Sequence, residues 1–308
     1  MNFTTKRRRS DGVLEDWSAE RQTLTSANLC APYQYSFSPT LQYSSTPYFS
    51  HSRTPFFMKP AREHLRCFVA PAAWRGTVLS VEETEAHHLV NVLRARVGER
   101  VEVFDGAGRT GFAEVAAIAK RGAELRLLEQ NFQPRPAPEL VLVQALPREA
   151  TMDFIVQKAV ELGASAIFPV LSERCIVRLT PDQYAEKSAR WQRIALNAAR
   201  QSHAAWLLHI AAVQPLDKFF QGLEKMDFWF VGSLAAHAVP LRDALATART
   251  AAPRRVAALI GPEGDFTADE YRAAEAAGAV PVTFGANVLR SDTAAFYAIS
   301  AMKLILTD

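Results

Sequence analysis

Alternating apolar and polar positions between residues 66 and 128 are typical of antiparallel strands with one buried face. The alternation is clearest at 101–104, 112–115 and 124–128, where charged side chains separate apolar ones. One segment, 82–96, changes to apolar residues at three- and four-residue steps, which is the spacing of a helix. This part of the chain therefore predicts a small β-barrel with one helix.

Beyond residue 140, short continuous apolar runs alternate with segments of helical spacing. Runs typical of buried strands occupy 140–146, 166–171, 208–213, 228–231, 256–260 and 280–284. Helical spacing occupies 152–162, 181–202, 268–277 and 292–306. Alternation of this kind predicts an α/β fold, with a mostly parallel sheet covered by helices on both faces.

A polar, proline-rich segment at 131–138 separates these two patterns. We therefore predict a barrel domain at 63–133 and an α/β domain at 134–308. Residues 1–62 carry a basic run and a tract rich in Ser, Thr, Pro and Tyr without periodicity, which predicts a disordered or adventitious extension. A targeting peptide is an alternative that the early acidic residues disfavour, and a natural start at Met58 is another.

Composition excludes some classes of protein and leaves others open. The 308 residues are 49% apolar and contain no apolar run long enough to span a bilayer, so we expect no membrane role. A net charge of +3 is too small to indicate a nucleic-acid partner by itself. Cys30, Cys67 and Cys175 are widely separated and have no histidine at metal-ligand spacing, which indicates reduced thiols in a cytoplasm and no metal site.

The sequence Gly106-Ala-Gly-Arg-Thr-Gly111 satisfies the glycine pattern of dinucleotide-binding folds. That site needs a buried parallel strand before the glycines and a helix after them. Both flanks here alternate apolar and polar residues instead, so the hairpin-turn interpretation is favoured.

Two loops follow the strands predicted at 256–260 and 280–284, at positions where α/β proteins bind ligands. In Gly261-Pro-Glu-Gly264, glycine permits close approach of a ligand to the main chain, while the P-loop pattern is absent. The second loop ends in Arg290, and either Ser291 or Asp292 is a candidate N-cap for the last helix. Together the loops suggest a cradle for an adenosine-like group.

Both loops, with the segments 152–163, 169–174 and 190–195, closely resemble the RsmE family of SPOUT-superfamily methyltransferases. The barrel part is similar as well, through 87–94 and 103–106, and the family's order is kept from about residue 66 to residue 306. The resemblance implies a PUA-like barrel followed by an α/β domain with a deep C-terminal trefoil knot. It also implies a homodimer with the cofactor pocket near the subunit interface.

The activity implied by the resemblance is methylation of N3 of a uridine in 16S ribosomal RNA of the small subunit, with S-adenosylmethionine as cofactor. The residues it assigns to cofactor binding are Leu259, Gly261, Gly264, Phe284, Gly285, Leu289, Arg290 and Thr293. Arg290 is the expected catalytic residue, as a donor to the uracil oxygens. The residues assigned to RNA contacts are Arg66, His88, Arg94, Arg96, Arg148 and Lys158.

The chain departs from the family pattern at a few positions. Asn287 and Arg200 stand where the family usually has Arg and Glu, and Asp265 stands where Gly is frequent. Glu263 or Asp292 is a candidate for assisting proton removal, although acidic residues in such turns more often act as caps. Two alternatives stay open: a SPOUT methyltransferase acting on another RNA nucleotide, and a non-catalytic RNA-binding protein of ribosome assembly.

Overall fold

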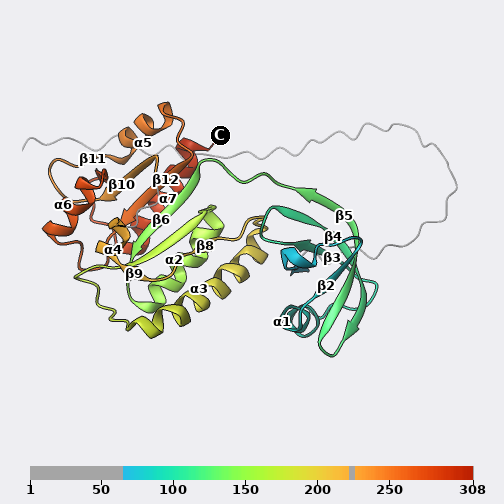
Figure 1. Ribbon diagram of the computed structural model, residues 1–308. Coiled ribbons are helices and arrows are strands. Elements are labelled where there is room, and N and C mark those ends of the chain that lie inside the picture. The colour runs from blue at the N-terminus through green and yellow to red at the C-terminus, as the bar shows by residue number, and fades with distance from the viewer. Residues whose placement is uncertain (1–64, 222–225, 308) are drawn as a thin grey trace, which may run out of the picture. The chain divides into compact units, whose positions relative to one another are not determined.

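The computed structural model describes residues 65–221 and 226–307 (Figure 1). The predicted extension at 1–62 and the alternative start at Met58 lie outside the described residues. Two sheets organise the described part, one built from the strands before residue 133 and the other from the strands after residue 138.

The first sheet has five strands in the order β1-β3-β4-β5-β2. All neighbours are antiparallel except β1 and β3, which are parallel. The core lies inside this sheet and contains the fully buried side chains of Leu79, Leu89, Val103 and Leu125. The strands are β1 Arg66–Phe68, β2 Val78–Val81, β3 Arg100–Phe104, β4 Arg109–Ala119 and β5 Gly122–Phe132.

The helix predicted at 82–96 is confirmed but is shorter. It consists of α1, Glu83–His87, continued by a wider π-helical turn, His88–Val92. Arg94 then adopts a left-handed backbone with φ of 56°, which ends the helical path two residues before the predicted end. A single-turn helix, Pro71–Ala73, precedes β2 and was not predicted.

The glycine pattern at 106–111 lies in a hairpin between the antiparallel strands β3 and β4, as favoured from the sequence. Gly106 and Gly108 have φ of 70° and 97°, conformations that a side chain disfavours. The Asp105 carboxylate closes the turn by accepting from the Ala107 and Arg109 main-chain nitrogens at 2.7 and 3.0 Å. The turn therefore has a structural explanation that needs no nucleotide.

The second sheet is parallel, with eight strands in the order β11-β13-β10-β12-β6-β7-β8 and with β9 pairing β7. The strands are β6 Glu139–Ala145, β7 Ala166–Leu171, β8 His209–Ile210, β9 Gln214–Pro215, β10 Phe228–Gly232, β11 Val239–Pro240, β12 Arg255–Ile260 and β13 Val280–Thr283. The helices are α2 Glu149–Leu162, α3 Pro181–Ser202, α4 Leu216–Gln221, α5 Leu241–Thr250, α6 Ala268–Ala276 and α7 Ser291–Leu306. The predicted α/β fold is confirmed.

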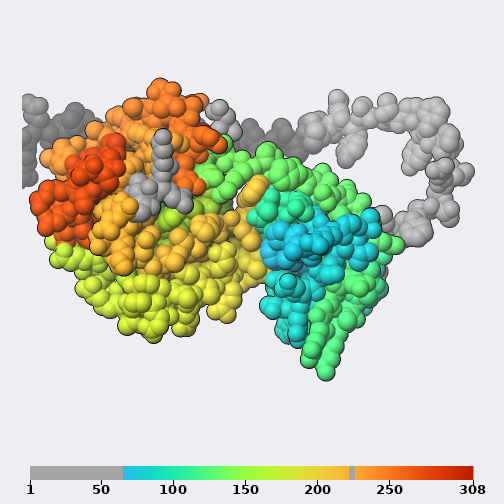
Figure 2. Space-filling view, viewed as in Figure 1, coloured from blue at the N-terminus to red at the C-terminus, as the bar shows by residue number. Residues whose placement is uncertain are grey.

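The last helix, α7, packs on β6 and β12 and contacts both α2 and α5. Its buried face contains Ala295, Ala298, Ile299 and Met302, and the alanines allow close approach to the sheet. Helix α3 instead keeps most of its length at the surface, in yellow-green in Figure 2, and buries Trp191 and small residues on one side. None of the helices in the described ranges combines the length and the apolar content that crossing a bilayer requires.

The order of the central strands determines where the loops meet. β12 lies between β6 and β10, and β13 lies on the other side of β10. Because these strands are parallel, their carboxyl ends share one edge of the sheet. The segments that follow β10, β12 and β13 therefore lie side by side.

Candidate functional site

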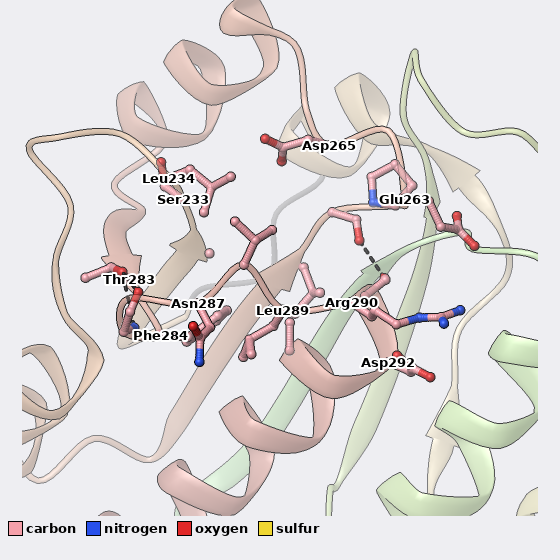
Figure 3. Close-up of a pocket in the computed structure, with 18 of the residues that line it drawn as sticks. Ser233, Leu234, Glu263, Asp265, Thr283, Phe284, Asn287, Leu289, Arg290 and Asp292 are labelled. Carbon is pink, nitrogen blue, oxygen red and sulfur yellow. Dashed lines mark hydrogen bonds between the residues drawn. The ribbon is translucent and has the colours of Figure 1, made fainter.

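A cavity of about 330 Å³ opens at this edge of the sheet (Figure 3). Its walls come from the segments after β10, β12 and β13, with the first turn of α7 and Thr151 of α2. The volume is in the range of small-molecule sites, and the walls combine apolar side chains with exposed main chain. The arrangement is suited to a flat, partly polar ligand of nucleoside size.

The segment after β12, residues 261–266, forms one wall. Gly261, Glu263 and Asp265 line the cavity, and Asp265 has a left-handed backbone with φ of 61°. Glycine adopts this conformation without strain, whereas a side chain such as that of Asp265 disfavours it. Behind the wall, Arg174 Nη1 donates to the carbonyls of Gly264 and Phe266 at 3.4 and 3.3 Å.

The segment after β13, residues 284–290, forms the opposite wall. Gly285 has φ of 117°. The Thr283 hydroxyl donates to the Gly285 carbonyl at 3.2 Å and accepts from the Gly285 main-chain nitrogen at 3.3 Å. Phe284 packs against the main chain of Gly232, where an added Cβ would lie 2.8 Å from the ring. Leu289 adds an apolar surface in the middle of the cavity (Figure 3).

A third segment of the cavity wall was not predicted from the sequence. Gly232, Ser233 and Leu234 follow β10 and line the cavity, as does Tyr271 of α6. The strand at 228–231 was predicted, so its carboxyl end was a signal for this segment. Tyr271 carried no such signal, because a single tyrosine in an alanine-rich helix indicates nothing about a site.

Hydrogen bonds join the segments to each other. Ser291 Oγ donates to the Gly261 carbonyl at 2.6 Å and accepts from Gln144 Nε2 at 3.0 Å. The Tyr271 hydroxyl lies 2.7 Å from Asp265 Oδ1 and 3.1 Å from the Gly232 carbonyl. Burial, followed by the bond to Asp265, raises the pKa of Tyr271, so its hydroxyl stays protonated and donates.

The N-cap expectation for the last helix is wrong in detail. The N-cap position is Arg290, and its side chain makes no capping bond. Ser291 is already inside the helix, and its hydroxyl bonds to Gly261 instead. Asp292 Oδ1 accepts from the Thr293 main-chain nitrogen at 2.8 Å, which is a local contact within the first turn.

Five of the residues expected to bind the cofactor line the cavity together: Gly261, Phe284, Gly285, Leu289 and Arg290. The other three do not line it. Leu259 is buried within β12, and Gly264 faces Arg174, whose carbonyl oxygen an added Cβ would approach to 3.0 Å. Thr293 is exposed in the first turn of α7, where its hydroxyl lies 3.4 Å from Asp292 Oδ1.

Three ionisable side chains of the cavity lie at one end, away from Asp265. Figure 3 shows Arg290 there, with Glu263 and Asp292 on either side of it. Arg290 is exposed and has no ion pair within the residues that the structure describes. Glu263 accepts from the main-chain nitrogen of Arg148, at the start of α2, at 3.2 Å. Basic and acidic groups for proton handling therefore occur at the same end.

The residues expected to contact RNA differ in their exposure. Arg94, Arg96 and Arg148 are exposed. Lys158 is partly exposed but pairs with Glu161 on the same helix at 2.7 Å. His88 is half-buried, and burial together with the charge of Arg200 lowers its pKa.

Arg66 is a correction to that set, because only 3% of its surface is exposed. Its guanidinium donates to the Ala199 and Ala204 carbonyls at the end of α3 and pairs with Glu102 at 3.0 Å. An arginine at a helix C-terminus satisfies carbonyls that lack partners within the helix. A structural role therefore replaces the expected contact with a phosphate.

Metal ligands do not cluster in the described part of the chain. Within residues 65–221 and 226–307, His, Cys, Asp and Glu side chains form no group of three or more that is able to hold an ion.

Family models match both halves of the chain. A model described as an RNA methyltransferase domain matches residues 133–303, and one described as an RNA methyltransferase PUA domain matches residues 81–128. Among curated proteins, the ribosomal RNA small subunit methyltransferase E of a Synechocystis strain is 32% identical over 246 residues, which cover 78% of each chain. The protein of the same name from Bacillus subtilis is 27% identical and aligns over 73% of this chain and 89% of its own.

A solved structure agrees with these matches. The ribosomal RNA small subunit methyltransferase E of Neisseria gonorrhoeae, bound to S-adenosyl methionine, superposes with a TM-score of 0.69 at 30% identity. The superposition covers 78% of this chain and 97% of that one.

Proposed function

The chain belongs to the ribosomal RNA small subunit methyltransferase E family, and we propose that it methylates N3 of a uridine in 16S ribosomal RNA with S-adenosylmethionine as the methyl donor. The observation that carries the proposal is the cavity itself. Five residues expected from the sequence to bind the cofactor line one space of about 330 Å³ at the carboxyl edge of the sheet.

The cavity residues fit this cofactor. Main-chain groups around Gly261, Gly285 and Leu289 would bind the adenine, and Leu234 and Phe284 would offer apolar contact; in support, all five residues line the cavity. Bound S-adenosylmethionine supplies a methyl group that is already activated, so the protein must place the acceptor, exclude water and handle one proton.

Proton handling is assigned to the ionisable end of the cavity. Methylation of N3 requires the imide proton to leave, while negative charge spreads onto the uracil oxygens. Arg290 would donate hydrogen bonds to that charge; in support, it lines the cavity and makes no ion pair within the described residues. Glu263 and Asp292 are the carboxylates at the same end that are able to accept the proton.

We further expect the chain to act in the cytoplasm, as its cysteines indicate, and to form a homodimer with a knotted C-terminal region, as its family resemblance implies. Exposed apolar side chains on α2, on α7 and in the loop after β13 support the dimer. They are Phe154, Val288, Tyr297 and Leu304, which are 44%, 74%, 49% and 84% exposed. Sedimentation of the wild type and of a Leu304→Asp variant tests this expectation, with a shift from dimer to monomer as the predicted result.

The function is tested in two steps. Calorimetry with S-adenosylmethionine tests for the cofactor site, and mass mapping of methylated uridines in ribosomal RNA from cells with and without the gene identifies the target. Loss of one N3-methyluridine from 16S ribosomal RNA is the expected result. Cofactor binding with a different missing modification would identify another RNA nucleotide, and binding without any missing modification would contradict catalysis.

A further inference from the structure

Three separate segments form the walls of the cavity, and each follows a different strand. Their spacing at the open edge therefore depends on contacts between the segments themselves. In the described structure, the side-chain hydroxyls of Ser291 and Tyr271 reach from one segment to another.

The Ser291 hydroxyl joins the segments after β12 and β13. It is 8% exposed, donates to the Gly261 carbonyl at 2.6 Å and accepts from Gln144 Nε2 at 3.0 Å. Gln144 is fully buried in β6, and its amide also donates to the Ala145 carbonyl at 2.9 Å. The amide is therefore held in place, and it orients the serine toward Gly261.

The Tyr271 hydroxyl lies between the segments after β10 and β12. It faces both Asp265 Oδ1 at 2.7 Å and the Gly232 carbonyl at 3.1 Å. Its ring packs edge-on against Phe266, with centroids 5.5 Å apart. Because the phenol carries one proton, it donates to one of these acceptors at a time, and the side chain of Ser233, after β10, also bonds to the hydroxyl. Tyr271 therefore keeps a bond to the segment after β10 whichever acceptor its proton takes.

We propose that Ser291 and Tyr271 are positioning residues that set the spacing of the three walls before the cofactor binds. The proposal rests on the proposed function, since the spacing is the one that S-adenosylmethionine requires. Walls that are already in place lose little conformational freedom on binding, and this raises affinity. Neither hydroxyl takes part in methyl transfer, so their removal affects cofactor binding and leaves the chemical step unchanged.

The test compares Ser291→Ala and Tyr271→Phe with two matched controls. Ser188→Ala removes a hydroxyl that bonds to the Ala211 carbonyl at 3.4 Å, and Tyr184→Phe removes a phenol from α3, both away from the cavity. Calorimetry well below the melting temperature is expected to show S-adenosylmethionine binding about tenfold weaker in each test variant. The controls are expected to bind as the wild type does, and Ser291→Thr, which keeps a hydroxyl, to restore most of the affinity.

Steady-state kinetics then separates positioning from a purely structural effect. We expect KM for S-adenosylmethionine to rise while kcat at saturation stays within about twofold of the wild type. Folded variants that bind the cofactor with unchanged affinity would overturn the proposal, and so would a fall in kcat at unchanged KM. Tyr271→Phe keeps the ring and its packing, so it decides the matter even if Ser291→Ala fails to fold. A wild type that binds no S-adenosylmethionine would instead refute the proposed function.

Discussion

Arg290 is the basic side chain among the residues that line the cavity, and its exposed position supports the chemical role proposed for it over a packing role. It is exposed at the end of the loop that follows β13, immediately before α7, and its side chain makes no capping bond. Charge that develops on the uracil oxygens needs a donor, and a pre-positioned guanidinium provides one at small reorganisation cost.

Replacing Arg290 with alanine is expected to lower kcat by roughly 10²- to 10³-fold, as loss of one charge-stabilising donor does. The affinity for S-adenosylmethionine is expected to stay within about twofold, because main chain and apolar side chains form most of the cofactor walls. Calorimetry and single-turnover methylation measure the two quantities. Arg272→Ala, which removes an arginine paired with Asp269 on α6, is the control. Normal turnover of Arg290→Ala would remove this residue from the mechanism.

Cys67 is a second residue whose behaviour follows from its surroundings. It is 1% exposed in β1, and burial raises the pKa of its thiol to about 12. The thiolate is the reactive form, so Cys67 is expected to resist iodoacetamide at pH 8 in the native protein and to react in urea. Peptide mapping by mass spectrometry measures this residue separately from the other cysteines. Equal labelling rates in the two conditions would show that β1 opens readily.

Motifs in the sequence predicted some residues of the site but not the contacts that they make with other segments. Gly261, Gly285 and Arg290 were selected by their motifs, and all three line the cavity. Ser291 was one of two candidates for capping the last helix. Its actual partner, the Gly261 carbonyl at 2.6 Å, could not be predicted, because the two residues lie far apart in the sequence and meet only in the folded chain. Tyr271 was missed for the same reason, since its partners come from two other segments.

At the scale of elements, continuous apolar runs located the central strands well. The predicted strand at 166–171 and the predicted helix at 181–202 match β7 and α3 at both ends. The run at 208–213 became the two-residue strand β8, because only His209 and Ile210 pair with β7. Helix α5 was missed, although Leu241, Ala244, Leu245 and Ala248 have helical spacing, because alanine carries a weak apolar signal.

The contact between the end of β10 and the loop after β13 supports a prediction at this scale. A methyl group added by Gly232→Ala would lie 2.8 Å from the Phe284 ring, so the ring must move. We expect cofactor affinity to fall and stability to decrease by about 1 to 3 kcal/mol, as overpacking does. The measurements are calorimetry and urea unfolding.

A double-mutant experiment tests whether the Phe284 ring causes the effects of Gly232→Ala. Phe284→Leu removes the atoms that the new methyl group would meet, so adding Gly232→Ala to it should cost less than Gly232→Ala costs alone. Additive effects of the two substitutions would show that Gly232 acts through something other than Phe284.

At the scale of the whole molecule, RNA binding requires basic groups that are free to meet phosphates. The net charge of +3 gives no strong overall attraction, so local groups must provide it. Arg94 and Arg96 follow the barrel helix, are exposed and have no ion pair among the described residues. Arg66 was expected beside them, but its burial was invisible in the sequence, because the carbonyls it meets come from α3, about 130 residues later in the chain.

The salt dependence of RNA affinity measures phosphate contacts by Arg94 and Arg96, because each contact releases counterions from the RNA. Each phosphate contact contributes roughly 0.7 to 0.9 to the slope of log affinity against log salt concentration. If both arginines contact phosphates, the double variant Arg94→Ala/Arg96→Ala is expected to lower the slope for small-subunit RNA by about 1.4 to 1.8 and to leave cofactor binding unchanged. Arg126→Ala is the matched control, because Arg126 is also exposed in the barrel but pairs with both Glu114 oxygens at 2.9 Å. A slope that is the same in the wild type and the double variant would mean that the RNA docks elsewhere, and the arginines around the cavity mouth, Arg148 and Arg290, would be the next to test.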